Sequence, residues 1–335
     1  MRANLSTPMS ALRVLWPHNF DPAIPVAGVF MHGARRALSD AGVVPELRYL
    51  GNLRNPLQLI IARQAIAQAA AGADLLHCQY GSAASLACSS VRSCPKIVSL
   101  RGSDWTAAYS PRLLGKAHAA LATRFTRLAL PHFDIVICVS NQLAEEVQRF
   151  TPHIQVRVLP SPVDLSVFRP MEKAAARRTL GLRESGPRYV VFGSAMSGTP
   201  RKRRWLAEAA IRKVQDVLPD VRLLVATGYP HSMMPSVLSA ADVAICTSTS
   251  EGWPNFIKEA LACNVPFVST DVSDLAHIAA IEPTCRVVAP TAEALSEALL
   301  DVLNSPQPRD LRRHVASMDF AMHAEQLIRI YRQLA

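Results

Sequence analysis

The most informative part of the chain is residues 242–274, DVAICTSTSEGWPNFIKEALACNVPFVSTDVSD. Its apolar start predicts a buried strand that ends in a Thr/Ser-rich turn, and a helix is expected over 254–263. Pro254 suits the first turn of that helix because its φ is already fixed near the helical value, and Pro266 opens the next strand. The helix would direct its unpaired N–H groups and the positive end of its dipole beyond the strand end. This arrangement predicts an anion site suited to a diphosphate.

Two carboxylates flank the predicted anion site. Glu251 lies in the loop before the helix, and Glu259 lies inside the helix, eight positions further on. Carboxylates in these places can accept hydrogen bonds from two separate sets of hydroxyl groups on one extended ligand. A nucleotide sugar offers both sets of hydroxyls and a diphosphate between them, so it is the ligand class that this stretch predicts.

Outside this stretch, short runs rich in Val, Ile and Leu alternate with helical patterns in two complete series. The apolar runs are continuous, which is typical of parallel strands covered on both faces. The expected strands are 12–16, 44–50, 74–80, 96–101, 134–140 and 156–160 in the first series, and 188–194, 221–227, 242–247, 266–270 and 285–289 in the second.

The two series are separated by LPSPVDLSVFRP, residues 159–170, which holds three prolines. We therefore predict two Rossmann-like, doubly wound α/β domains facing each other across a cleft. The N-terminal domain is expected over 1–165 and the C-terminal, nucleotide-sugar-binding domain over 166–318. Residues 319–335 form an amphipathic helix that either caps its own domain or crosses back to the first.

The composition excludes several classes of protein. Of 335 residues, 50% are hydrophobic and 19% are charged, which excludes bulk disorder. No apolar run reaches the length of a membrane span, and the N-terminal stretch lacks the apolar segment of a secretory signal. The seven cysteines are an odd number without a CxxC pair. A reduced, cytoplasmic protein without structural zinc is therefore expected.

The net charge of +10 is concentrated in the first half of the chain, where 17 Lys and Arg face 9 Asp and Glu. A basic amphipathic helix is predicted over 111–130. Its cations fall near one face, and its apolar side chains admit two interpretations: they pack on the core, or they dock on an anionic membrane surface. Nucleic acid is not an expected partner, since no motif for it is present. The cations of the predicted helix are Arg112, Lys116, Arg124 and Arg127, and its apolar side chains are Leu113, Leu114, Leu121, Phe125 and Leu128.

The spacing Glu251-x7-Glu259 within SEGWPNFIKEALACNVPFVSTDV resembles the EX7E signature of the GT4 family, retaining glycosyltransferases of GT-B fold. The resemblance is strong over about 187–275 and covers the rest by topology only. The ADV of 241–243, with Thr247 and Ser248, also fits the family's pattern before the signature. The further residues in register are Pro254, Ala260, Ala262, Pro266, Val268, Thr270 and Asp271.

The resemblance implies roles for residues of the second domain. Glu259 would bind the ribose hydroxyls of the donor, and Glu251 would lie beside the donor sugar. Arg201 and Lys202 would neutralise the leaving diphosphate without a metal or other cofactor, and Arg203 and Arg204 are the alternatives. The backbone that would hold the diphosphate and sugar hydroxyls belongs to Pro254, Asn255 and Phe256.

The first domain resembles the family less closely. Gly28 alone remains of the usual Gly-rich turn, and it would approach the donor. Arg101 stands where the family commonly has His, and Arg101 or Asp104 would contact donor or acceptor. The family's Asn-Gly-Val-Asp is replaced by SPVD at 161–164.

The resemblance implies transfer of a hexose from a nucleoside-diphosphate sugar to a saccharide or lipid-linked saccharide acceptor, in polysaccharide or glycolipid synthesis. Location at the inner face of the membrane is expected if the basic helix docks there. The alternative from another class is an inactive GT-B homologue that acts as an assembly partner. A GT-B epimerase or phosphorylase is less favoured, and a dinucleotide-dependent dehydrogenase least, because no GxGxxG follows the first strand.

Overall fold

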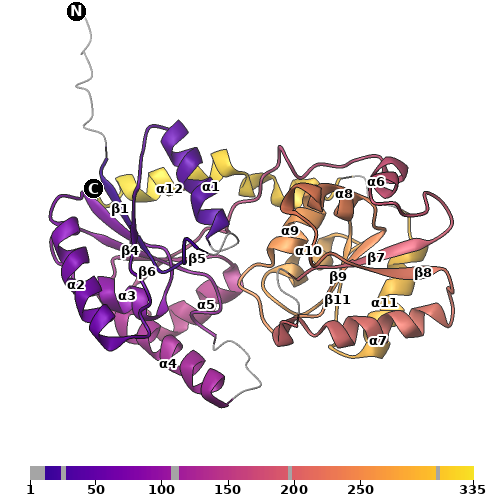
Figure 1. Cartoon of the computed structure of the whole chain (residues 1–335), viewed down its shortest axis with the longest axis horizontal. Coiled ribbons are helices and arrows are strands. Elements are labelled where there is room, and N and C mark those ends of the chain that lie inside the picture. The colour runs from indigo at the N-terminus through magenta and orange to yellow at the C-terminus, as the bar shows by residue number, and fades with distance from the viewer. Residues whose placement is uncertain (1–11, 24–27, 107–112, 195–197, 307–309) are drawn as a thin grey trace, which may run out of the picture.

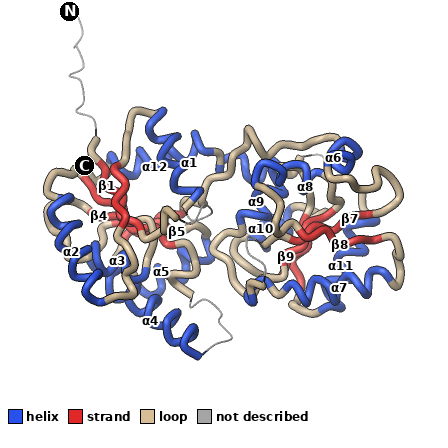
Figure 2. Tube along the Cα trace, in the orientation of Figure 1, coloured by secondary structure: helices blue, strands red, loops and turns tan. Residues whose placement is uncertain are grey.

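The computed structural model describes all residues except 1–11, 24–27, 107–112, 195–197 and 307–309. The chain forms two lobes that lie side by side along the long axis of the molecule (Figure 1). Each lobe has a parallel sheet with helices on both faces, as the colouring by secondary structure makes plain (Figure 2). The predicted pair of doubly wound α/β domains is confirmed.

The N-terminal lobe contains a six-stranded sheet in the order β2-β1-β3-β4-β5-β6. Every neighbouring pair is parallel. The central strands are buried along their whole length, which explains why their sequences are continuously apolar. The strands are β1 (Val14–His18), β2 (Glu46–Tyr49), β3 (Leu75–Cys78), β4 (Lys96–Leu100), β5 (Ile135–Cys138) and β6 (Gln155–Val158).

The two faces of this sheet carry different helices. One face packs against α1 (Val29–Asp40) and α12 (Phe320–Arg332), which contact each other. The other face packs against α2 (Pro56–Ala70), α3 (Ser82–Cys88), α4 (Leu113–Ala129) and α5 (Asn141–Phe150), with the 3-10 turn η1 (Leu130–His132) after α4. The chain direction of the crossovers dictates this division, because each parallel connection is right-handed.

The C-terminal lobe contains a five-stranded parallel sheet in the order β11-β10-β9-β7-β8. One face packs on α7 and α11, and the other on α8, α9 and α10. The strands are β7 (Arg188–Phe192), β8 (Val221–Val225), β9 (Val243–Cys246), β10 (Phe267–Thr270) and β11 (Arg286–Val288). The helices are α6 (Lys173–Thr179), η2 (Pro200–Lys202), α7 (Arg204–Gln215), η3 (His231–Met233), α8 (Met234–Ser239), α9 (Asn255–Ala262), α10 (Leu275–Ile281), α11 (Ala292–Asn304) and η4 (Arg312–Met318).

Helix α4 buries an unexpected set of residues. Its inner face consists of Thr123, Thr126 and Ala129, and the Thr126 hydroxyl bonds to the backbone carbonyl of Asp104 and to the N–H of Ser82. Its leucines point outward, and Leu114 is 86% exposed. The interpretation in which these leucines pack on the core is therefore wrong.

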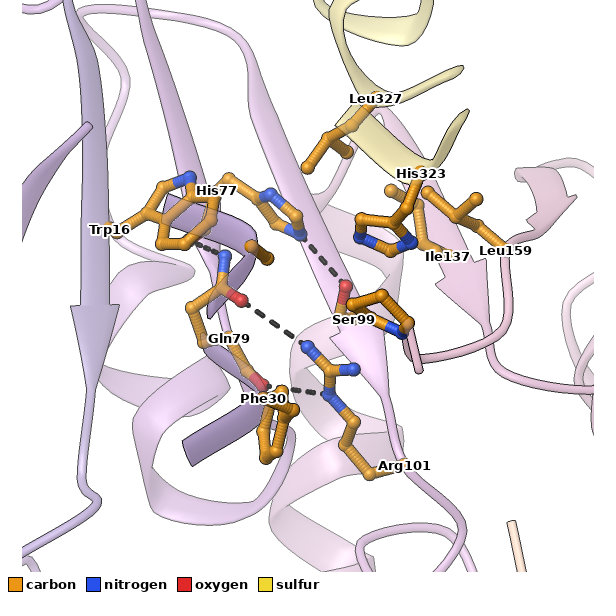
Figure 3. Close-up of a pocket in the computed structure, with 12 residues that line it drawn as sticks. Trp16, Phe30, His77, Gln79, Ser99, Arg101, Ile137, Leu159, His323 and Leu327 are labelled. Atoms are coloured by element: carbon orange, nitrogen blue, oxygen red, sulfur yellow. Dashed lines mark hydrogen bonds between the residues drawn. The ribbon is translucent and has the colours of Figure 1, made fainter. Parts of the chain in front are cut away.

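Helix α12 lies on the N-terminal lobe although it follows the C-terminal lobe in the chain (Figure 1). Its Tyr331 hydroxyl accepts a hydrogen bond from Trp16 Nε1 at 2.8 Å and lies 2.7 Å from His77 Nδ1. The indole N–H can only donate, which leaves the phenol O–H to donate to His77 Nδ1. In that tautomer His77 Nε2 carries the proton and donates to Ser99 Oγ at 2.8 Å (Figure 3). Burial lowers the pKa of His77 well below its usual value, in agreement with this neutral tautomer.

The two lobes touch at glycines. A Cβ on Gly252 would lie 2.0 Å from the Arg101 carbonyl oxygen, and one on Gly102 would lie 2.6 Å from the Gly252 Cα. A second contact is polar: the Asp274 carboxylate accepts hydrogen bonds from the backbone N–H groups of Asn141 and Gln142, at 2.9 and 3.1 Å. Asp274 thereby caps the N-terminus of α5 from the other lobe.

Candidate active site

The predicted catalytic residues of the C-terminal lobe meet at one carboxylate. Glu251 Oε1 lies 2.6 Å from Arg201 Nη1 and 2.6 Å from Lys202 Nζ. The Ser248 hydroxyl donates to the same oxygen at 2.7 Å. Burial alone would raise the pKa of Glu251, but Lys202 and Arg201 outweigh it, so the pKa lies below its usual value. The carboxylate is charged and enclosed, with its side chain 9% exposed.

The backbone at the carboxyl end of β9 holds the two cations in place. The Thr247 hydroxyl donates to the Lys202 carbonyl at 2.7 Å, and Arg203 donates to the carbonyls of Thr247 and Ser248. Arg203 itself has a left-handed φ of 47° and is the N-cap residue of α7. Since Arg203 binds this loop and Arg204 pairs with Glu208, the contacts with Glu251 belong to Arg201 and Lys202.

Helix α9 begins one residue later than the sequence suggested. Pro254 is extended, with φ −68° and ψ 109°, and acts as the N-cap residue, not as the first helical residue. No side chain caps this helix end. Phe256 packs directly on Gly193 at the end of β7, where a Cβ would lie 2.1 Å from the Phe256 ring. The N–H groups of Ile257 and Lys258 bond to the Pro254 carbonyl, so those of Asn255 and Phe256 are the ones that this helix end offers to an anion.

Glu259 lies further along α9 and has a different partner. Its Oε1 is 3.9 Å from His231 Nε2, and its side chain is 18% exposed. The neighbouring Glu259 carboxylate is the main cause that raises the pKa of His231 above its usual value. The two acids therefore occupy separate environments: Glu251 is neutralised by two cations, and Glu259 faces one exposed imidazole.

Arg101 directly follows β4, at the carboxyl edge of the N-terminal sheet. Its guanidinium donates to the Gln79 carbonyl and Gln79 Oε1, at 3.4 and 3.3 Å, and stands 4.1 Å from the centre of the Phe30 ring (Figure 3). Arg101 Nη1 also donates to Ser161 Oγ at 2.8 Å. The two departures from the family pattern, at 101 and 161, are therefore in direct contact.

Asp104 is fully buried and serves the loop that follows β4. Its carboxylate accepts hydrogen bonds from the backbone N–H groups of Arg101 and Gly81, both at 2.9 Å. Burial raises its pKa above the usual value. These contacts orient the loop that carries Arg101 and Gly102, so Asp104 fixes the position of Arg101.

Gly28 is the N-cap of α1 and has a left-handed φ of 71°, which favours glycine. No side chain caps this helix end. The residues before it, 24–27, lie outside the described part of the chain.

Lys258 is a residue of the site region that sequence reasoning missed. Its ammonium group is fully buried, donates to the Ser161 carbonyl and lies 5.7 Å from the centre of the Trp253 ring. Burial lowers its pKa from 10.5 to about 7. The only sequence signal is a lysine in an otherwise apolar helix face, one position before Glu259.

The described part of the chain contains no group of three or more His, Cys, Asp or Glu side chains that could hold a metal ion. No described helix is long and apolar enough to cross a membrane.

Two models of glycosyltransferase families match the chain. Residues 27–167 match the model described as Glycosyltransferase Family 4, and residues 182–305 match the model described as Glycosyl transferases group 1. Together the two matches span both lobes. The chain belongs to the family 4 glycosyltransferases of GT-B fold.

Three relatives of known name match part of the chain. The glycosyltransferase TuaC of Bacillus subtilis, named for teichuronic acid biosynthesis, is 27% identical over 68% of this chain and 60% of its own length. The D-inositol 3-phosphate glycosyltransferase of Segniliparus rotundus is 32% identical over 36% of this chain and 33% of its own length. The α-maltose-1-phosphate synthase of Mycolicibacterium smegmatis is 25% identical over 62% of this chain and 65% of its own length. The matches thus span less than two thirds of the length of each relative.

Solved structures agree on the fold. Sucrose-phosphate synthase from Thermosynechococcus elongatus superimposes with a TM-score of 0.76 at 19% identity, over 96% of this chain and 98% of that chain. Anabaena HepE, solved in complex with UDP and glucose, gives a TM-score of 0.66 at 14% identity, over 96% and 100%. The predicted GT-B fold is confirmed.

Proposed function

We propose that this protein is a glycosyltransferase that transfers a hexose, with retention, from a nucleoside-diphosphate sugar to a saccharide or lipid-linked saccharide acceptor. The observation that carries the proposal is the Glu251 carboxylate, 2.6 Å from both Arg201 and Lys202 and beside the uncapped start of α9. Family membership supports the reaction class, and the HepE complexes with UDP and UDP-glucose support the donor class. The relative named for teichuronic acid supports a role in polysaccharide synthesis.

The chemistry follows from the charges. Arg201 and Lys202 share one carboxylate, so the cluster has a net positive charge that a diphosphate can neutralise. As the donor's glycosidic C–O bond breaks, negative charge grows on the leaving phosphate, and these fixed cations stabilise it without a metal ion. The new C–O bond forms on the same face of the sugar, and the acceptor's hydroxyl proton passes to a leaving phosphate oxygen. Glu259 binds the ribose hydroxyls.

The binding experiment uses the full chain with UDP, GDP and ADP and their glucose derivatives. A ligand at 100 times its Kd adds about 2.7 kcal/mol to stability, so thermal shift should identify the donor base. Titration calorimetry with that nucleotide should show at least about tenfold weaker binding for Glu259→Ala, since two charge-assisted hydrogen bonds are lost. The exposed Glu208→Gln variant is the control and should bind like the wild type. Equal affinity for Glu259→Ala would contradict the proposal.

Turnover separates the transferase from an inactive homologue. Glu251→Gln should keep nucleotide binding but lose about 100-fold or more in donor turnover, because the acid beside the sugar is gone. An inactive assembly partner would bind the nucleotide without turning over any donor, in the wild type and in both variants. Arg101 and Ser161 are the two residues that differ from the family pattern, and they form a hydrogen bond with each other. This mutual contact favours an active enzyme over an inactive homologue.

We also place the protein on the cytoplasmic side of the membrane. All seven cysteines are free thiols, six of them buried, as expected in a reducing compartment.

A further inference from the structure

Helices α2 and α4 share an unusual property: both expose large apolar side chains. Each packs against α3 on the same face of the N-terminal sheet. Their exposed side chains range from 46% for Leu121 to 86% for Leu114. We call these residues, together with the cations described next, the α2–α4 face. The apolar members are Leu57, Ile60, Ile61, Leu113, Leu114, Leu121 and Leu128.

The α2–α4 face is basic, and the acid that lines a hollow together with its Arg124 is Glu146 of α5. Neither helix contains Asp or Glu. Between residues 51 and 133 the sequence has only two acids. Asp104 is buried, and Asp74 pairs with Arg13 at the opposite, amino edge of the sheet. The exposed cations of these helices and of the loop before α2 are Arg54, Arg63, Lys116, Arg124 and Arg127, the last of which lies over the Trp105 ring.

These side chains are not required for packing within the lobe. Helix α4 is attached through Thr123, Thr126 and Ala129, and α2 through Ala62, Ile66 and Ala70. Leucines and isoleucines that stay in water on an adequately packed helix mark a surface for contact with another apolar phase. Cations on long side chains around them can reach anionic groups while their methylene stems lie on apolar surface.

We propose that the α2–α4 face docks on an anionic lipid bilayer. Charge complementarity selects this occupant: a second copy would place cation against cation, and nucleic acid would require exposed aromatics that this face lacks. Lipid headgroups supply the anions, and the acyl boundary accepts the leucines.

The position of the face adds a spatial argument. Helices α2 and α4 follow β2 and β4, so both begin at the carboxyl edge of the sheet. Helix α4 contacts that edge through Thr126, which bonds to the Asp104 carbonyl and the Ser82 N–H, and Leu113 and Leu114 lie in its first turn, about three turns earlier. A bilayer on this face would thus meet the apolar first turn of α4. The inference goes beyond the proposed function, because it does not depend on turnover.

The test is co-sedimentation of the full chain with vesicles, either phosphatidylcholine alone or phosphatidylcholine and phosphatidylglycerol in equal parts. We expect binding only to the anionic vesicles, decreasing as the salt concentration rises. The double variant Leu113→Ser, Leu114→Ser should bind at least about tenfold more weakly, with an unchanged Tm because both side chains are exposed. The matched control is Val217→Ser, Ile281→Ser, which removes two largely exposed apolar residues from the C-terminal lobe and should bind like the wild type.

Three outcomes would overturn the inference. The first is equal binding to both kinds of vesicle. The second is equal loss in the control variant. The third is a dimer, seen by sedimentation velocity, that the Leu113→Ser, Leu114→Ser variant abolishes, because the face would then join two copies of the chain.

Discussion

Lys258 shows how a single buried charge can link the site to the junction of the lobes. Its ammonium group bonds to the Ser161 carbonyl, while its neighbour Glu259 faces the proposed ribose position. Arg101 bonds to the Ser161 hydroxyl from the other lobe. One linker residue thus receives a cation from each lobe, and neither of these contacts is to a carboxylate.

The lowered pKa of Lys258 predicts a pH-dependent stability. Burial brings the pKa from 10.5 to about 7 in the folded protein. Between these values the unfolded chain binds more protons than the folded one, so stability rises with pH from about 7 to about 10. Lys258→Met should flatten this part of the curve, as measured by urea unfolding at pH 7, 8 and 9.

The control for this prediction is Lys213→Met, which removes a half-exposed lysine of α7. It should leave the slope of stability against pH as in the wild type. A slope that is the same in Lys258→Met and the wild type would show that the Lys258 ammonium is not the responsible group.

The site was partly predictable at this scale. Glu251 and Glu259 could be found because they lie in one continuous motif, whereas Arg201 and Lys202 lie about 50 positions earlier and were predicted from the family resemblance. The contact of Arg101 with Ser161 joins residues 60 positions apart. It depends on how the lobes meet, which no local pattern encodes. The role of Asp104 as a backbone acceptor was hidden because it depends on how the loops after β3 and β4 meet within the N-terminal lobe.

At the scale of elements, the contact of the β4–α4 loop with the Glu251–Gly252 loop depends on the absence of side chains. A Cβ at Gly252 would lie 2.0 Å from the Arg101 carbonyl and 2.9 Å from Val139. Backbone atoms cannot move aside as a flexible side chain can. The loop bearing Glu251 would therefore be pushed away from the N-terminal lobe.

Gly252→Ala should consequently destabilise the protein by about 1–3 kcal/mol and reduce donor turnover. Urea unfolding and a donor-turnover assay measure the two effects. Gly72→Ala is the matched control, since its nearest neighbour is the Arg13 side chain at 3.8 Å, and it should change stability by less than about 0.5 kcal/mol. An unaltered Gly252→Ala protein would mean that the lobes do not meet here in solution.

Element prediction succeeded where periodicity was strong. The buried parallel strands were recognisable because they are apolar on both faces. The short helices α6 and α8, of seven and six residues, were not predicted. Helix α4 was predicted, but its buried face was not: two threonines and an alanine pack inward because their size allows close approach to α3.

At the scale of the whole molecule, α12 unites distant parts of the chain through Tyr331. Its hydroxyl satisfies both Trp16 of β1 and His77 of β3 in a fully buried setting. Tyr331→Phe would leave the indole N–H and His77 Nδ1 without this partner. The cost of such unpaired buried groups is about 1–3 kcal/mol each.

We expect Tyr331→Phe to lower the free energy of unfolding by about 2–4 kcal/mol, measured by urea denaturation. Tyr49→Phe is the control, because that side chain is 41% exposed, and it should stay close to the wild type. If both variants behaved alike, the phenol of Tyr331 would not be what secures α12.

The return of α12 to the first lobe has a consequence for biosynthesis. Strand β6 ends at Val158, yet the helix that completes that lobe's core begins at Phe320. During translation the emerging N-terminal lobe must therefore wait, with Trp16, Met31 and Leu38 incompletely covered, until the whole second lobe has left the ribosome. The nascent first lobe is thus the stage at which a chaperone would have most to protect.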